Sequence, residues 1–211
     1  ARRPLRADGL AVDIAPVAAH EQARDIDMTT ILAIPGSWRS GSYNLALARA
    51  AQALAPAGCT VELASIAAIP VYDGDSEAAQ GVPAPVAELK DRIAAADALL
   101  LVTPEYNNSV PGPLKNAIDW LSRPASDLAR VFGDKPTGLI GASPGPGGTR
   151  LAQAAWLPVL RLLGTRPWFG KSVYVADAGK AFDAGGALVD ERLRGVLAAY
   201  LQGFAQFAAA R

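Results

Sequence analysis

The sequence contains few of the side chains that most often carry metal, redox or acid–base chemistry. Its 211 residues include one cysteine, one histidine and one methionine. A lone cysteine excludes an internal disulfide, and one cysteine with one histidine cannot build a typical zinc site. We therefore expect no metal in the function. The histidine, His20, lies in a segment that we do not expect to belong to the folded core.

Charge and long apolar runs are also lacking. Twenty basic residues balance twenty acidic ones, so no bulk charge is available to recruit nucleic acid or an anionic membrane. No stretch approaches the roughly 20 apolar residues needed to cross a bilayer, and no apolar core of signal-peptide length follows the first arginines. We expect a cytoplasmic protein that acts on a small molecule and binds neither nucleic acid nor a membrane.

The composition that is present favours one domain. Hydrophobic residues make up 51% of the chain, and no long linker interrupts it, so it can bury one substantial core. Residues 1–27 are polar and precede the only methionine, Met28. We predict that they form an N-terminal extension outside the catalytic core and that residues 28–211 form the functional domain.

Apolar segments typical of buried strands alternate with helix-forming segments along the rest of the chain. Strands are predicted at 30–34, 60–64, 98–102, 137–141 and 173–175, and helices at 44–55, 86–93, 113–121 and 149–163, with 69–85 as a loop. A last helix is predicted to pack through one stripe, formed by Val189, Leu193, Val196, Leu197, Tyr200, Phe204 and Phe207. This alternation predicts a three-layer α/β fold with a five-stranded parallel sheet in the flavodoxin-like order 2-1-3-4-5. Loops 36–44 and 104–112 would then face one another at the topological switch point, with 142–148 alongside.

The first of these loops has the chemistry of a phosphate site. A helix N-terminus favours an anion, and Ser37, Ser42 and Asn44 can donate hydrogen bonds to phosphate oxygens. The loop lacks the Gly-Lys-Ser/Thr ending of nucleotide-hydrolysing loops, and no Gly-x-Gly-x-x-Gly follows a strand. A monophosphate on a cofactor is therefore the expected guest. The alternative interpretation is a solvated loop in which Ser42 only caps the helix.

The second loop is suited to a planar ring. Pro104 and Pro111 stiffen its backbone, and Tyr106 offers an aromatic wall beside Asn107. Such a loop could recognise the edge of a flavin without an ionisable catalytic group. Glu105 is open to three interpretations: a partner for a cation, a contact to a neighbouring chain, or a plain surface carboxylate.

At these loops the chain resembles the NADPH-dependent FMN reductases, in particular their bacterial quinone and chromate reductase branch. Ser37-Trp-Arg-Ser-Gly-Ser-Tyr-Asn44 is similar to the family's Ser-Leu-Arg-x-x-Ser-x-Asn loop, with Trp38 where leucine is usual. The match is nearly unbroken over Thr103–Asn107 and Pro111–Ser122. The resemblance covers roughly residues 30–205.

The resemblance implies bound FMN, NADPH or NADH as co-substrate, and hydride transfer through the flavin to quinones or similar acceptors. Chromate, ferric complexes and azo compounds are possible further acceptors. It implies a homodimer or homotetramer, with no catalytic acid or base because the flavin carries the hydride chemistry. The implied cofactor-binding residues are Ser37, Arg39, Ser42, Tyr43, Asn44, Pro104, Glu105, Tyr106, Asn107, Ser143, Gly147 and Gly148.

Two other functions remain open at this point. A flavodoxin-type carrier would bind FMN and pass single electrons to proteins, and a flavin-binding protein without turnover would pass none. Flavodoxins usually have a strongly acidic surface and a phosphate loop without arginine, whereas this chain has zero net charge and Arg39. These features favour the enzyme.

Overall fold

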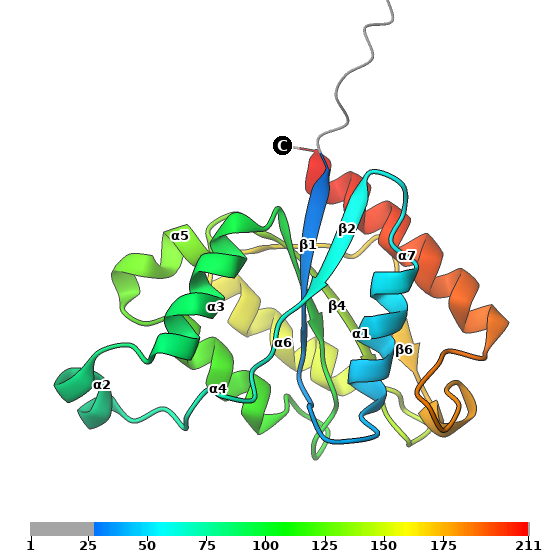
Figure 1. Ribbon diagram of the computed structural model, residues 1–211, viewed down its shortest axis with the longest axis horizontal. Helices are drawn as coiled ribbons and strands as arrows, with labels where there is room; N and C mark the ends of the chain where they lie inside the picture. The colour runs from blue at the N-terminus through cyan, green and yellow to red at the C-terminus, as the bar shows by residue number, and fades with distance from the viewer. Residues whose placement is uncertain (1–27, 211) are drawn as a thin grey trace, which may run out of the picture.

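The computed structural model describes residues 28–210, so the expectation about residues 1–27 lies outside the described part. Strands and helices alternate along it (Figure 1). The strands are β1 (Thr29–Pro35), β2 (Cys59–Leu63), β3 (Ala98–Val102), β4 (Pro136–Ala142), β5 (Arg166–Pro167) and β6 (Val173–Val175). The α-helices are α1 (Tyr43–Ala53), α2 (Gly74–Gln80), α3 (Ala84–Ala95), α4 (Gly112–Leu121), α5 (Leu128–Phe132), α6 (Arg150–Leu162) and α7 (Glu191–Ala209), and two 3₁₀ turns span Ala125–Asp127 and Ala178–Lys180. No helix within 28–210 has the length and apolar character needed to span a bilayer.

The sheet confirms the predicted flavodoxin-like order. Strands β2, β1, β3 and β4 are neighbours in that order, and every pairing is parallel. The fifth position is shared by two short strands. Strand β5 pairs with the start of β4, and β6 pairs with its end.

Trp168 explains why the fifth position is split. Its backbone N–H donates to the carbonyl of Thr137 at 2.9 Å, directly after β5. Its indole packs edge-on against Tyr200 of α7, with ring centroids 4.7 Å apart. The chain therefore leaves the strand path where this half-buried ring packs on α7, and it rejoins β4 at Val173. The sequence predicted only the second of the two strands.

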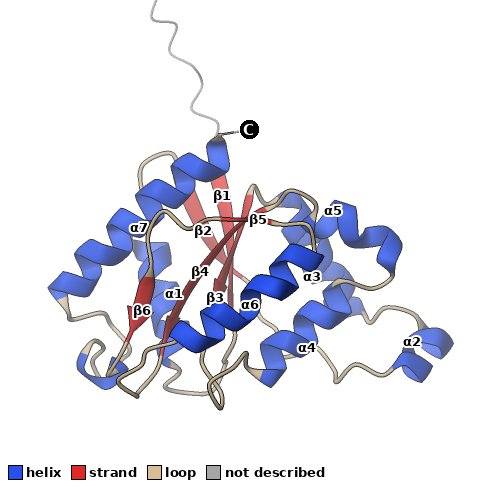
Figure 2. Ribbon diagram, turned by 180° about the vertical axis from the view of Figure 1, so that it is seen from behind, coloured by secondary structure: helices blue, strands red, loops and turns tan. Residues whose placement is uncertain are grey.

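Helices cover both faces of the sheet, as the parallel connections require. In β1, Ile31 and Ala33 face the cluster that contains α1 and α7, whereas Leu32 and Ile34 face the cluster that contains α3, α4, α5 and α6. Figure 2 shows the second layer from its own side. Because β1 is buried on both faces, its residues read as a continuous apolar run.

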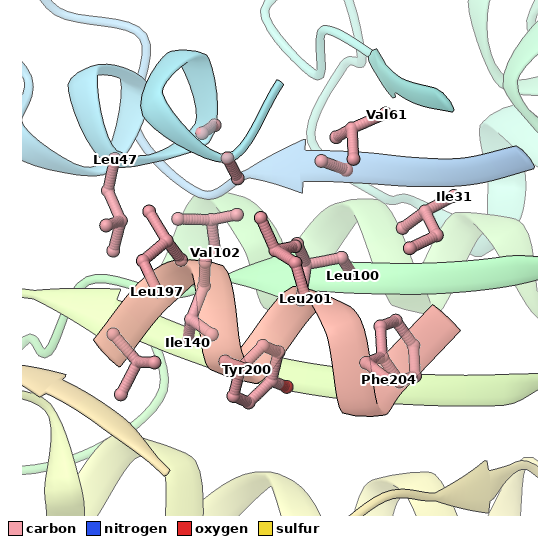
Figure 3. Packing of buried hydrophobic residues seen from close by; sticks show 14 of the residues in the cluster. Ile31, Leu47, Val61, Leu100, Val102, Ile140, Leu197, Tyr200, Leu201 and Phe204 are labelled. Carbon is pink, nitrogen blue, oxygen red and sulfur yellow. The ribbon is translucent and has the colours of Figure 1, made fainter. Parts of the chain in front are cut away.

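Helix α7 packs on the sheet through Leu197, Tyr200 and Phe204, which lie over β3 and β4 in Figure 3. Tyr200 is fully buried, and its hydroxyl donates to the carbonyl of Leu139. The predicted stripe is wrong at Val189, which precedes the helix and is half exposed. It is also wrong at Val196, which is 42% exposed.

The motif that opens α4 serves the fold as well as the site. Trp120 and Leu121 are buried in the core of this chain, as are most apolar residues of the helix. The Trp120 indole N–H and the Asn116 amide N–H both donate to the carbonyl of Pro70. The side-chain oxygen of Asn116 accepts the N–H of Tyr72. Helix α4 thus anchors a segment that lies far away in sequence.

That segment was predicted as a loop and contains the short helix α2. None of the seven residues of α2 is buried. It is held by Glu77, which accepts hydrogen bonds from the Tyr72 hydroxyl at 2.8 Å and the Arg123 guanidinium at 3.0 Å. The hydrogen bond from Tyr72 and then the Arg123 partner lower the pKa of the Glu77 carboxyl.

Lys90 is a second buried tie on this face of the sheet. Its side chain is 2% exposed, and its ammonium donates to the carboxylate of Asp127 at 2.6 Å and to the carbonyl of Arg123. A buried ammonium is tolerated only when it is paired and hydrogen-bonded. Lys90 therefore fixes the turn between α4 and α5.

Candidate functional site

Three loops meet at the carboxyl ends of β1, β3 and β4, at the lower edge of the sheet in Figure 1. In a parallel α/β sheet of this order, that edge is where ligands bind. A small pocket of about 70 Å³ lies between the loops. Its lining comprises Ser37, Arg39, Ser42, Tyr43, Asn44, Pro104, Glu105, Tyr106, Ala142, Ser143 and Pro144. Ligand pockets usually measure about 300–1,000 Å³, so this one suits a phosphate group better than a whole cofactor.

The pocket brings together nine of the twelve predicted site residues. Asn107, Gly147 and Gly148 are predicted residues that do not line it. Ala142 and Pro144 line it without having been predicted. Ala142 is the last residue of β4, and its place at a strand end was the only signal in the sequence that could have identified it.

Ser42 is the N-cap of α1. Its hydroxyl accepts the N–H of Leu45 at 3.2 Å and donates its proton to the carbonyl of Ser37 at 3.0 Å. The residue is 5% exposed. Because a hydroxyl has one proton to donate, Ser42 has none left for a ligand in this arrangement. The structure thus favours the capping interpretation of Ser42 over the donor interpretation.

Asn44 ties the first loop to the third. Its amide donates to the carbonyl of Ala142 at 2.8 Å, and its oxygen accepts the N–H of the same residue at 2.9 Å. Asn44 is buried, and this two-way bond joins residues 98 positions apart. Its main contribution is to hold the end of β4 against the start of α1.

Other groups of the first loop are available to an anion. Within the described chain, the N–H groups of Tyr43 and Asn44, in the first turn of α1, have no acceptor. The hydroxyl of Ser37 donates to no acceptor there either, and the exposed guanidinium of Arg39 donates only to the adjacent carbonyl of Ser40. A helix N-terminus with unpaired N–H groups, a hydroxyl and a guanidinium is suited to a phosphate.

The second loop is a rigid projection beside the pocket. Tyr106 and Ser109 exchange both backbone hydrogen bonds across a two-residue turn. Asn107 and Asn108 have φ values of 50° and 60°, which is the left-handed backbone of a type I′ hairpin turn, where asparagine is favoured. The turn places Asn107 at the exposed tip and leaves Tyr106 on the pocket wall.

Glu105 links the second loop to the third. Its carboxylate accepts the N–H groups of Leu151 and Ala152, at 2.9 and 3.0 Å. These two N–H groups lie in the first turn of α6, where a helix supplies no acceptor of its own. The N-cap residue, Thr149, makes no side-chain cap hydrogen bond. A carboxylate satisfies these donors and offsets the positive end of the helix dipole. Of the three interpretations left open for Glu105, none anticipated a cap on a helix of its own chain.

A buried hydrogen bond reinforces this link. The Trp156 indole of α6 donates to the hydroxyl of Thr103 at 3.0 Å, and that hydroxyl donates to the carbonyl of Pro104. Gly141 makes the close approach possible, since a Cβ there would lie 2.2 Å from the carbonyl oxygen of Thr103. The second and third loops are therefore fixed to one another.

The third loop is anchored from behind. Ser143 donates its N–H to the carbonyl of Val175 in β6, and the carbonyl of Gly145 accepts the N–H of Asp177. Gly148 has φ of 64°, and a Cβ there would lie 3.2 Å from Tyr174. Gly148 thus lets the loop turn closely over β6, and Gly147 has open space around it. Gly148 therefore shapes the loop, and neither glycine lines the pocket.

Fold and site together define a flavodoxin-like α/β protein with a small polar pocket at the topological switch point. The sequence model of the NADPH-dependent FMN reductases matches residues 29–180. An NAD(P)H-dependent FMN reductase of Pseudomonas aeruginosa is 44% identical over 176 residues, which cover 83% of this chain and 93% of the relative. The chain belongs to the NADPH-dependent FMN reductase family and is an oxidoreductase of that class.

Two further relatives agree. A 2-hydroxy-1,4-benzoquinone reductase of Burkholderia sp is 37% identical over 175 residues, covering 83% of this chain and 93% of that protein. Among solved structures, FerB, a flavoenzyme NAD(P)H:(acceptor) oxidoreductase of Paracoccus denitrificans, superposes with a TM-score of 0.76 at 36% identity. The match covers 85% of this chain and 97% of FerB.

Proposed function

We propose that the protein binds FMN and transfers hydride from NAD(P)H through it to quinones or similar small acceptors. The observation that carries this proposal is the anion pocket at the switch point, with unpaired N–H groups of Tyr43 and Asn44. The printed functions of the relatives, FMN reductase and quinone reductase, support it. FMN supplies the hydride chemistry, and the protein supplies binding, orientation and a suitable electrostatic environment.

The residues of the site fit the phosphate end of this cofactor. The main-chain N–H groups of Tyr43 and Asn44, the Ser37 hydroxyl and the Arg39 guanidinium would hold the phosphate. The walls formed by Pro104 and Tyr106 would line the rest of the cofactor outside the small pocket. Ser42, Asn44 and Glu105 contribute side chains that keep these groups in place. Their fixed positions lower the ordering cost of binding.

Two spectroscopic steps test the proposal. The purified protein, loaded with FMN, is first reduced anaerobically with NADPH and then mixed with benzoquinone. We expect the flavin absorbance to bleach and then to return. A protein that binds no FMN would refute the proposal. A protein that is reduced by NADPH but passes electrons only to a protein partner would instead be a single-electron carrier.

A matched pair of variants tests the pocket itself. Ser37→Ala removes a hydroxyl that can reach the phosphate, whereas Ser40→Ala removes an exposed hydroxyl outside the pocket lining. A lost hydrogen bond to a charged group costs about 1.5–3 kcal/mol, so we expect Ser37→Ala to weaken FMN binding about tenfold or more. Ser40→Ala should change FMN binding less than twofold. Equal effects of the two would contradict this placement of the phosphate.

We further propose that the protein acts in the cytoplasm, where NAD(P)H is produced, and forms a homodimer or homotetramer. Ile118, Trp120 and Leu121 do not support association, because they are buried within the chain. The support comes from α6, where Leu151 and Leu162 are 52% and 82% exposed. Sedimentation velocity of Leu162→Arg tests this, and a parent that sediments as a monomer would refute it.

A further inference from the structure

A second cavity adjoins the phosphate pocket on the outer side of α1. It has a volume of about 260 Å³ and shares Ser42 and Tyr43 with that pocket. One wall is the outward face of the first two turns of α1. The other is the turn Phe182–Gly186, at the tip of a hairpin closed by the Phe182 and Leu188 bridge. The site described above makes no use of this cavity.

One wall of the cavity carries a cation without an acidic partner. Arg49 lies six residues after Tyr43, about 9 Å along the helix axis. Side chains on a helix lean towards its N-terminus, so the guanidinium can reach towards the phosphate pocket. No carboxylate among residues 28–210 forms an ion pair with Arg49.

The other wall carries a carboxylate. One oxygen of Asp183 accepts the N–H of Ala187 at 2.8 Å, which fixes the side chain within its turn. The second oxygen makes no hydrogen bond within the described chain. Arg49 and Asp183 both line the cavity, yet no ion pair joins them. The cavity therefore offers a guanidinium that can bind an anion and, at a separate place, a carboxylate oxygen that can accept a hydrogen bond from a hydroxyl.

Aromatic rings form the end of the cavity next to the phosphate pocket. The rings of Tyr43 and Phe182 stack with centroids 6.2 Å apart. Ala46, Gly185 and Gly186 add small side chains and accessible backbone. The lining thus combines an apolar surface, one guanidinium and one carboxylate. These are the groups that recognise a base, a phosphate and a ribose.

We propose that this cavity binds the ADP moiety of a dinucleotide. The phosphate would contact Arg49, the ribose hydroxyls would donate to Asp183, and the base would lie against the apolar wall. A carboxylate that accepts ribose hydroxyls is the usual discriminator against a 2′-phosphate in dinucleotide sites, so plain ADP should bind more tightly than 2′-phospho-ADP. The proposal rests on the proposed function in one respect, that the adjacent pocket takes the phosphate of a flavin.

Two cofactors carry an ADP moiety, and both are compatible with this position. In FAD, the flavin's own phosphate is the first phosphate of the ADP moiety, so the second phosphate and the adenosine would pass from one cavity into the next. In NADH it would belong to the co-substrate that approaches the bound flavin. Both sources present the same phosphate, ribose and base. The experiment separates them.

Binding of ADP to the FMN-loaded protein and to the apoprotein, measured by titration calorimetry, is the first test. Arg49 and Asp183 are exposed, so Arg49→Ala and Asp183→Asn should fold. Loss of a charged hydrogen bond predicts at least tenfold weaker ADP binding for Arg49→Ala. Asp183→Asn should reduce the preference for ADP over 2′-phospho-ADP. Arg161→Ala, which removes an exposed arginine on α6, is the matched control and should leave ADP binding within twofold.

Affinities of the apoprotein for FMN and FAD, and the KM for NADH, identify the carrier. If Arg49→Ala weakens FAD but not FMN, the cavity holds the FAD tail; if it raises the KM for NADH, the cavity holds the co-substrate. Either result supports the proposal. Absence of ADP binding to the parent, or an Arg49→Ala variant unchanged in all three measurements, overturns it. A parent that binds FMN and is reduced, yet fails these tests, leaves the proposed function intact.

Discussion

Removal of the Glu105 carboxylate should both destabilise the protein and loosen its flavin site. Glu105→Ala leaves the N–H groups of Leu151 and Ala152 without their acceptor, in a helix whose own N-cap makes no side-chain bond. Loss of a cap costs about 0.5–2 kcal/mol, and loss of a charge at the helix dipole costs about 0.3–1 kcal/mol. We expect a loss of about 2 kcal/mol, which lowers the Tm by about 4–8 °C in a domain of this size.

Two further variants isolate the cause. Glu105→Gln keeps an acceptor oxygen and loses only the charge, so it should cost no more than about 1 kcal/mol. Glu88→Ala removes an exposed carboxylate from the middle of α3 and should change stability by less than about 0.5 kcal/mol. Urea unfolding of the apoprotein measures the stabilities, and fluorescence titration measures FMN affinity. Glu105→Ala unfolding at the parent's midpoint, or Glu105→Gln as damaging as Glu105→Ala, would refute the capping argument.

Three other perturbations follow from the ties described above. Asn44→Ala removes two buried hydrogen bonds to the Ala142 peptide and should cost about 2–4 kcal/mol in urea unfolding, with weaker FMN binding; unchanged stability would contradict it. Lys90→Met leaves the Asp127 carboxylate and the Arg123 carbonyl without their buried donor and should lower the free energy of unfolding by about 2–3 kcal/mol. A more stable variant would show that the pair is dispensable. Since hydrogen bonding from Tyr72 lowers the pKa of Glu77, the carboxylate stabilises the fold above the unfolded pKa of about 4.3, and this contribution is lost as pH falls through the folded pKa. Glu77→Gln should therefore be less stable than the parent at pH 7 and should approach it as the pH falls through the folded pKa of Glu77. Urea midpoints measured across pH check this, and a stability gap that widens on acidification would contradict it.

The regular part of the fold could be predicted because its strands are buried on both faces. Strand β3 is five consecutive apolar residues that end at Thr103-Pro104, and its predicted bounds are those observed. Strand β5 could not be predicted, because two residues carry no periodicity and its position depends on the packing of Trp168 against Tyr200, a residue distant in sequence. Helix α2 has no buried residue, so it lacks the apolar spacing that identifies a helix.

The location of the candidate site could be predicted more fully than the hydrogen-bond partners of its side chains. Loop positions follow from strand order, so Ser37, Arg39 and Pro104 were expected to come together. The hydrogen bonds of the Asn44 and Glu105 side chains are made to backbone groups 98 and 46 residues away. Local sequence shows that these side chains can form hydrogen bonds. It does not show which peptide lies within reach.

The unpaired N–H groups at the start of α1 imply that the anion pocket is defined by main-chain shape. A peptide N–H is the same in every residue except proline, so the main-chain part of the pocket depends on the path of the loop. Trp38, for example, packs against the apolar cluster and does not line the pocket. The side chains that fix this path are Ser42, through its cap on α1, and Asn44, through its hydrogen bonds to the Ala142 peptide.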